Sequence, residues 1–207
     1  MLANDRVSTN NTESETTLDS ERELIWRCQQ GDRHSFRLLY RIYQKRVRST
    51  LYQLCGNAML DDLVQEVFFR AWKGLPKLKQ REYFSTWLYR ITWNVAIDRR
   101  RKLAKSHNHS TIIEPAIAEE LEIHDNGLVE AQDTPDLMQL HYQDLVQRGL
   151  ASLSLDHRAV LVLHDLEDLP QKQIAKILDI PIGTVKSRLF HARNSLKKFL
   201  QQQGISL

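Results

Sequence analysis

The chain has 207 residues, of which 42% are hydrophobic and 27% are charged, and its formal net charge is +3. This length fits one domain or two small ones, with enough apolar residues for packed cores. The longest purely apolar run, residues 159–163, is far shorter than the roughly 20 residues that span a bilayer, so we expect no membrane insertion. The first residues lack the pattern of a secretion signal, and the two cysteines, Cys28 and Cys55, are too few for a disulfide scaffold or a zinc module. The sequence therefore excludes membrane, secreted and metal-finger classes and predicts a cytoplasmic protein.

The small net charge conceals a strong asymmetry along the chain. Residues 1–23 carry a net charge of −4, residues 24–105 carry +12, residues 106–136 carry −8 and residues 137–207 carry +3. Such a basic block favours a polyanion as its partner. The alternative interpretation is that the Lys and Arg side chains only solvate helix surfaces.

Helical periodicity dominates the basic block. Residues 1–20 are rich in Asn, Ser, Thr and Glu without apolar periodicity, so we expect a disordered tail. Apolar residues then recur at three- and four-residue steps in four stripes, which are interrupted at residues 31–32, 56–57 and 74–76. Asp61 is the expected N-cap of the third helix. Because no alternation of period two is found, residues 21–104 are predicted to form an all-α domain.

Residues 105–136 combine the acidic excess with scattered Pro and Gly and no sustained period, which predicts a flexible linker. Helical periodicity resumes at Leu137 and continues to the end, so residues 137–207 are the second predicted domain. Within it, residues 170–193 have the spacing of a helix-turn-helix. The fold class expected is therefore all-α, with two small helical domains on a flexible acidic tether.

The second helix of the predicted helix-turn-helix has an apolar side formed by Val185, Leu189 and Ala192. Its opposite side would be exposed and able to contact phosphates and base edges in a major groove. The residues on that side are Thr184, Lys186, Ser187, Arg188, Phe190, His191 and Arg193. An ordinary helical hairpin with a solvated basic face is the alternative.

The fourth predicted helix interleaves aromatic and cationic side chains, a pattern typical of surfaces that bind single-stranded nucleic acid. Phe84 and Trp87 belong to a stripe with core periodicity and are expected in the core. The residues off that stripe are the candidates for strand contact: Tyr83, Tyr89, Arg90, Trp93 and Asn94, followed by Arg99, Arg100, Arg101 and Lys102. The ring of Trp93 either stacks on a base or packs in the core, and the sequence leaves both interpretations open.

Two separate segments carry a resemblance to a known family. Asp61–Trp72, with Phe84–Ile91 and Asn94, resembles region 2 of the extracytoplasmic-function (group 4) sigma factors of the sigma-70 superfamily. Ile174–Leu178, with Pro181–Leu189 and Ala192-Arg193, resembles their region 4. The two segments stand in the family's order, and the resemblance covers roughly residues 21–104 and 137–200.

The resemblance implies a bacterial RNA polymerase initiation subunit without a catalytic site, cofactor or metal. Such a subunit binds core polymerase at the β′ clamp helices and the β flap. The positions that match the clamp-binding surface are Asp62, Gln65, Glu66, Phe69 and Arg70. The family also includes members with an anti-sigma partner, and no residue of this chain identifies one.

For promoter DNA, the resemblance implies two contacts. Residues 77–98 would bind flipped non-template bases of the −10 element, and residues 99–102 would hold the strand backbone. The helix at residues 186–193 would read the −35 element as duplex, with Lys186, Ser187, Phe190 and His191 at base-facing positions. The acidic linker would then follow a positively charged RNA channel of the polymerase, or be only a solvated tether.

Two other function classes fit parts of the sequence less well. A stand-alone regulator with a ligand-sensing N-terminal bundle would explain the helix-turn-helix but not the segment at residues 61–72. A nuclease or recombinase would need clustered metal carboxylates or a nucleophile beside a base. Asp61 and Asp62 would point about 100° apart on a helix, and His107 and His109 lie in the predicted linker. Promoter-specific transcription with core polymerase separates these classes.

Overall fold

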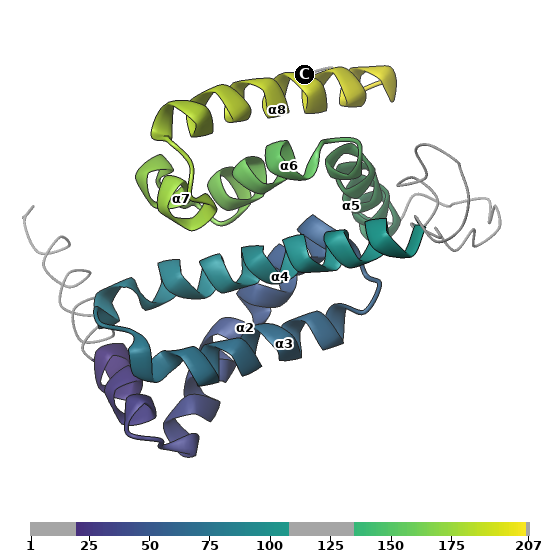
Figure 1. The fold of residues 1–207 in the computed structure, drawn as a ribbon. Coiled ribbons are helices and arrows are strands. Elements are labelled where there is room, and N and C mark those ends of the chain that lie inside the picture. The colour runs from purple at the N-terminus through teal and green to yellow at the C-terminus, as the bar shows by residue number, and fades with distance from the viewer. Residues whose placement is uncertain (1–19, 108–134, 206–207) are drawn as a thin grey trace, which may run out of the picture.

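The structure is a computed structural model that describes residues 20–107 and 135–205, and every regular element within these ranges is helical. After helical residues 20–29, the N-terminal domain contains α2 (Arg33–Cys55), α3 (Leu60–Gly74), the short 3-10 turns η1 (Leu75–Lys77) and η2 (Arg81–Tyr83), and α4 (Phe84–His107). The C-terminal domain contains α5 (Pro135–Ala151), α6 (Leu155–Leu161), the π-helical turn η3 (Val162–Leu166), α7 (Gln171–Leu178) and α8 (Ile182–Gln202) (Figure 1). The all-α class is confirmed. Most of the predicted tail and linker, together with His109, lies outside the described residues.

Local chemistry fixes the ends of α2. The carboxylate of Asp32 accepts hydrogen bonds from the Ser35 hydroxyl at 2.7 Å and the His34 amide at 2.8 Å, which lower the pKa of Asp32 and cap the helix. Gly56 ends the helix with a φ of 75°, a left-handed conformation that glycine adopts at little cost. Both ends agree with the interruptions predicted from the sequence.

The start of α3 differs from the prediction. Met59, with a φ of 58°, occupies the cap position and makes no side-chain capping bond, so the expectation that Asp61 caps this helix is wrong. Asp61 and Asp62 lie instead in the first turn, where carboxylates interact favourably with the helix dipole. Asp61 also pairs with Arg48, which joins the start of α3 to α2.

Apolar stripes of α2, α3 and α4 converge in the core of the N-terminal domain. Ring contacts connect the helices, with centroids 4.6 Å apart for Tyr40 and Phe68 and 5.3 Å apart for Tyr43 and Phe84. Phe84 is buried, as predicted, whereas Trp87 is half-buried at the edge of the core. A Cβ at Gly74 would stand 2.8 Å from a Trp87 ring carbon, so this glycine allows the end of α3 to approach the ring.

The C-terminal domain contains the predicted helix-turn-helix. Helices α7 and α8 are joined by residues 179–181, and Asp179 turns the chain with a φ of 57°. Helix α8 buries Val185, Leu189 and Ala192, and it packs on α6 as well as on α7. Gly149 of α5 lets Leu196 approach closely, because a Cβ there would lie 2.6 Å from a Leu196 methyl carbon.

The two domains are in contact. Helix α4 lies between α2 and α3 on one side and α7 on the other, and α2 touches α5, α6 and η3 (Figure 1). Buried apolar side chains of both domains form one continuous cluster. The sequence predicted modules held apart on a tether, and the structure instead packs their described parts together.

Candidate nucleic-acid and polymerase interfaces

The outer side of α8 is open to solvent. Phe190 is 64% exposed, and Lys186, Ser187 and His191 are exposed beside it. The ring of Phe190 lies 5.5 Å from that of His191, edge to face. We call these four residues the α8 face. They combine donors, an acceptor and an uncovered aromatic ring on one rigid helix.

Two predicted members of the α8 surface have other partners. Arg188 pairs with Asp156 of α6 at 2.8 Å, and Arg193 pairs with Asp165 of η3 at 2.5 Å. The guanidinium of Arg193, followed by His164, holds the pKa of Asp165 below its usual range. Arg193 is exposed, as expected, and Arg188 is half-buried; through these ion pairs both arginines also connect α8 with the layer beneath it. Thr184 is half-buried.

The exposed edge of α3 collects the five residues predicted to bind polymerase. Asp62, Gln65 and Phe69 are exposed, and Phe69 is 53% exposed. Arg70 is half-buried and donates to Asp98 and to Glu66, each at 2.7 Å; these bonds, the one to Asp98 foremost, raise the pKa of Arg70. The resulting edge has an apolar ring bordered by oriented charges.

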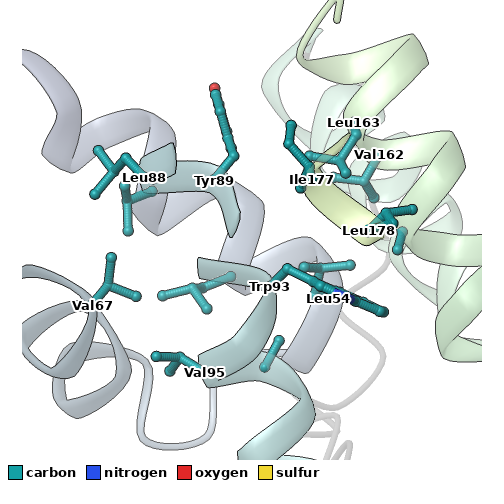
Figure 2. Close-up of a cluster of buried hydrophobic side chains, with 14 of the residues drawn as sticks. Leu54, Val67, Leu88, Tyr89, Trp93, Val95, Val162, Leu163, Ile177 and Leu178 are labelled. Atoms are coloured by element: carbon teal, nitrogen blue, oxygen red, sulfur yellow. The ribbon is translucent and has the colours of Figure 1, made fainter. Parts of the chain in front are cut away.

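The inner aromatic residues of α4 are buried, which differs from the exposure expected for Tyr89 and agrees with one of the two interpretations left open for Trp93. Tyr89 is 5% exposed and Trp93 is 7% exposed. Figure 2 shows both side chains on the side of α4 that faces Ile177 and Leu178 of α7 and the buried residues of η3. Helix α4 therefore has two buried stripes rather than one. The second stripe consists of Thr86, Tyr89, Trp93 and Ala96.

Polar contacts with the C-terminal domain surround these rings. The Tyr89 hydroxyl donates to Glu167 at 2.6 Å, and burial together with this bond raises the pKa of Tyr89. The Lys176 ammonium lies 5.0 Å from the centre of the Tyr83 ring. Arg90 lies 3.7 Å from a carboxylate oxygen of Asp179. Four predicted strand-binding residues, Tyr83, Tyr89, Arg90 and Trp93, thus contact or face the C-terminal domain.

The remaining candidates on α4 lie beyond this contact. Asn94, Arg100, Arg101 and Lys102 are exposed, and Arg99 is half-buried. We call Tyr83, at the end of η2, with Tyr89, Arg90 and Trp93 of α4, the α4 face; Tyr89 and Trp93 are buried in it, whereas Tyr83 and Arg90 are exposed beside the C-terminal domain. The exposed residues extend from it as a polar and cationic strip along the same helix.

The comparisons with known proteins agree with this division into two domains. The family models for sigma-70 region 2 and sigma-70 region 4 match residues 39–106 and 143–196. The chain is 31% identical over 185 residues to the ECF RNA polymerase sigma-E factor of Haemophilus influenzae, which is 88% of this chain and 96% of that protein. The chain belongs to the extracytoplasmic-function (ECF) family of RNA polymerase sigma factors. This confirms the family predicted from the sequence, and with it a promoter-recognising subunit of RNA polymerase.

Other relatives of this ECF sigma factor give the same result. It is 32% identical over 179 residues to the ECF sigma factor SigW of Bacillus subtilis, covering 86% of this chain and 95% of that protein. The structure of the sigma factor RpoE of Bartonella quintana, in complex with the anti-sigma factor NepR, matches with a TM-score of 0.62 and 25% identity over 80% of this chain and 96% of that one. CnrH, in complex with the cytosolic domain of CnrY, matches with a TM-score of 0.63 at 21% identity, over 88% of this chain and 97% of that one, and shows the shared fold.

Two residues of the ECF sigma factor that matter at the domain contact were missed by the sequence analysis. Glu167 accepts bonds from Tyr89 and Thr50, and Arg158 donates to the carbonyl oxygens of Leu54 at 2.9 Å and Ala151 at 2.8 Å. Burial lowers the pKa of Arg158. A charged residue directly before the apolar run 159–163 was the available signal for Arg158. Nothing in the sequence distinguished Glu167 from its acidic neighbours.

Within the described parts of the sigma factor, His, Cys, Asp and Glu side chains do not gather in threes as a metal site would require. Nor is any helix there both long enough and apolar enough to span a membrane. Both cysteines are reduced; burial raises the pKa of each thiol to about 11, so neither is a reactive thiolate at neutral pH.

Proposed function

We propose that the sigma factor uses three separate faces in initiation: the edge of α3 for core polymerase, the α4 face and its cationic extension for the −10 strand, and the α8 face for the −35 duplex. The observation that carries this proposal is the α8 face. A helix-turn-helix whose second helix buries Val185, Leu189 and Ala192, while Lys186 and Phe190 remain uncovered, presents the side chains that fit a major groove.

Each residue of the α8 face has a distinct chemical capability. The Lys186 ammonium donates to phosphate or to the acceptor atoms of guanine, and Ser187 can donate or accept. The exposed Phe190 ring suits a thymine methyl group. Arg188 and Arg193 hold the helix in position through Asp156 and Asp165, so we assign them an orienting role in this face.

For the edge of α3, Phe69 is the proposed anchor. An exposed aromatic ring surrounded by polar groups is typical of the centre of a protein interface. Glu66 is oriented by its 2.7 Å bond from Arg70, which prepares the carboxylate for a cation on the polymerase. Glu66→Lys should therefore weaken core binding about tenfold or more without changing the fold, and unchanged affinity would contradict this assignment.

For the −10 element, Tyr89 and Trp93 would stack on unpaired bases of the non-template strand. Asn94 and the cations Arg99, Arg100, Arg101 and Lys102 would follow the strand backbone. Stacking is worth about 1–3 kcal/mol per base, enough to favour the melted form of a weak duplex segment. This role requires that the C-terminal domain first leave the α4 face.

Further proposals follow from family membership. The family is one of non-catalytic initiation factors, and we propose that this chain likewise has no enzymatic activity and acts in the bacterial cytoplasm. Residues 21–104 and 137–207 are its proposed functional domains. Because a matching solved sigma factor is bound to the anti-sigma factor NepR, a partner of that class is also proposed here.

The test is run-off transcription with core RNA polymerase on a template chosen by sequencing the RNA 5′ ends that the reconstituted holoenzyme makes. Lys186→Ala should reduce transcription about tenfold from a promoter with its −35 element and much less from one without it. Lys197→Ala, which removes an exposed cation farther along α8, is the matched control and should have little effect. Failure to bind core polymerase would overturn the proposal.

A further inference from the structure

Helix α2 carries a positive charge that the proposed function does not use. Its 23 residues include six Lys or Arg side chains and no Asp or Glu. This charge of +6 is half of the +12 excess that residues 24–105 carry. None of the six cations belongs to the edge of α3, to the α4 face with its cationic extension, or to the α8 face. The charge of α2 therefore requires a separate explanation.

Five of the six cations form one row along the outer side of α2. They are Arg33, Arg37, Arg41, Lys45 and Arg48, and all five are exposed. Steps of three and four residues keep side chains on one side of a helix. The buried residues of α2 lie on the side that is turned toward α3 and α4. We call the five cations the α2 row, and at 1.5 Å per residue it is about 22 Å long.

The α2 row does not stabilise the helix that carries it. Arg33 is the first residue of α2, where the helix dipole disfavours a cation, and the last turn, where a cation would be favourable, has none. Like charges four residues apart on a helix destabilise it, and the row contains three such pairs. Within the described parts of the chain, Arg48 pairs with Asp61, and the other four members of the row belong to no ion pair. A surface that lowers the stability of its own helix is typical of a binding site.

The composition of the α2 row fits the backbone of a nucleic-acid duplex. The centre of a protein interface is depleted of charged residues and enriched in aromatic ones, whereas the row is uniformly cationic. The exposed Ile42 beside it is a single apolar side chain, which is common on protein surfaces. Single strands are bound by cations interleaved with aromatic rings, and no aromatic residue belongs to the row. A duplex presents one phosphate charge per about 1.7 Å of its axis, so the row matches about six base pairs.

We propose that the α2 row binds the phosphate backbone of duplex DNA, independently of sequence, as a site separate from the α4 and α8 faces. Such binding releases counterions and therefore weakens steeply with salt. The site would hold the sigma factor, and a polymerase that carries it, on DNA without specifying a promoter. It does not depend on which residues read the −10 and −35 elements, so the proposed function and this site can fail separately.

Fluorescence anisotropy of the free, full-length chain with a short labelled duplex of non-promoter sequence measures this site, at salt concentrations from about 50 to 200 mM. The variant with Arg33→Gln, Arg37→Gln, Arg41→Gln and Lys45→Gln should bind about tenfold more weakly or less at low salt. The slope of log affinity against log salt concentration should fall by about 3 to 4, close to one per phosphate contact. Gln is a good helix former and removes the repulsion, so the melting temperature should equal or exceed that of the parent.

The matched control removes the same charge from another helix. Arg37→Gln with Arg41→Gln removes two charges from the α2 row, whereas Lys197→Gln with Lys198→Gln removes two exposed charges near the end of α8. The two double variants have the same net charge, so a general electrostatic effect would weaken DNA binding equally in both. The row variant should lower the salt slope by about 2, and the α8 variant should leave it nearly unchanged. Equal losses would overturn the proposal.

The identity of the ligand is tested with the variant that carries four substitutions. Duplexes of unrelated sequence should lose affinity to the same extent, because phosphate contacts carry no sequence information. A loss confined to single-stranded DNA would overturn the assignment to duplex. If the variant keeps its affinity for duplex DNA but binds core polymerase more weakly, the α2 row contacts an acidic protein surface instead, and the proposal is wrong.

Discussion

Helices α4 and α8 have similar sequence signals and different environments. Each combines aromatic and cationic side chains with an apolar stripe, and each is predicted to bind nucleic acid. The α8 face is open to solvent, whereas Tyr89 and Trp93 of the α4 face are buried. The difference arises because α8 lies on one side of its domain, while α4 has neighbours on two sides (Figure 1). An aromatic residue off the main stripe can therefore be covered by a second partner, and it can contact a ligand only after that partner has moved away.

Truncating one ring from each face gives the largest expected contrast. Trp93→Ala should lower the free energy of unfolding by about 3–5 kcal/mol because it leaves a cavity in the shared core. Phe190→Ala should change it by less than about 0.5 kcal/mol. Denaturant unfolding followed by circular dichroism measures both. Similar losses for the two variants would mean that the rings are in similar environments.

Arg158 tests how much the polar part of the covered interface contributes. Arg158→Met keeps an aliphatic chain but leaves the carbonyl oxygens of Leu54 and Ala151 without their donor. We expect a loss of about 1–3 kcal/mol, less than for Trp93→Ala, in the same unfolding experiment. A free energy of unfolding equal to or above that of the parent would show that desolvation of the buried guanidinium destabilises the fold at least as much as its hydrogen bonds stabilise it.

Substitutions on the α8 face should weaken DNA binding even though they hardly change the free energy of unfolding. Phe190→Ala should weaken binding of the holoenzyme to −35 duplex by about 1–2 kcal/mol, since an apolar contact with a base or sugar is lost. Fluorescence anisotropy with a labelled duplex measures the change. If the affinity is unchanged, the Phe190 ring does not contact DNA, and the DNA-contacting part of the α8 face would then centre on Lys186.

The smallest effect concerns the pairing that orients α8. The pKa of Asp165 is lowered in the folded chain, so its contribution to stability is present above the unfolded pKa of about 4 and is lost as pH falls through the lower folded pKa. Asp165→Asn should therefore be slightly less stable than the parent between pH 5 and 8. The difference should vanish in acid. Unfolding curves from pH 3 to 8 test this, and a difference that grows in acid would contradict the pairing.

Most of the fold could be predicted from the sequence because it depends on interactions between residues that are close together along the chain. The ends of α2 depend on Asp32 and Gly56, and the helix-turn-helix depends on spacing within 24 residues. The same applies to the α8 face, whose exposure follows from a single stripe. The matching of two motifs in order was sufficient to predict the ECF family.

What the sequence did not predict depends on contacts between distant segments. Tyr89 and Glu167 are 78 positions apart, and no local pattern indicates that they meet. Tyr89 and Trp93 of the second stripe of α4 were visible in the sequence as aromatic residues off the first stripe, but the sequence predicted strand contact for Tyr89 and left packing and stacking open for Trp93. The ion pairs of Arg188 and Arg193 were not predicted, because the acids that pair with them lie on other elements.

Hydroxyl-radical footprinting of the unmodified free chain, analysed by mass spectrometry, compares the two faces in one sample. Phe190 and the 42% exposed Trp26 should be oxidised rapidly, whereas Tyr89 and Trp93 should be protected. Addition of core polymerase should raise the reactivity of Tyr89 and Trp93. Oxidation of Trp93 in the free chain as fast as that of Trp26 would contradict the covered α4 face.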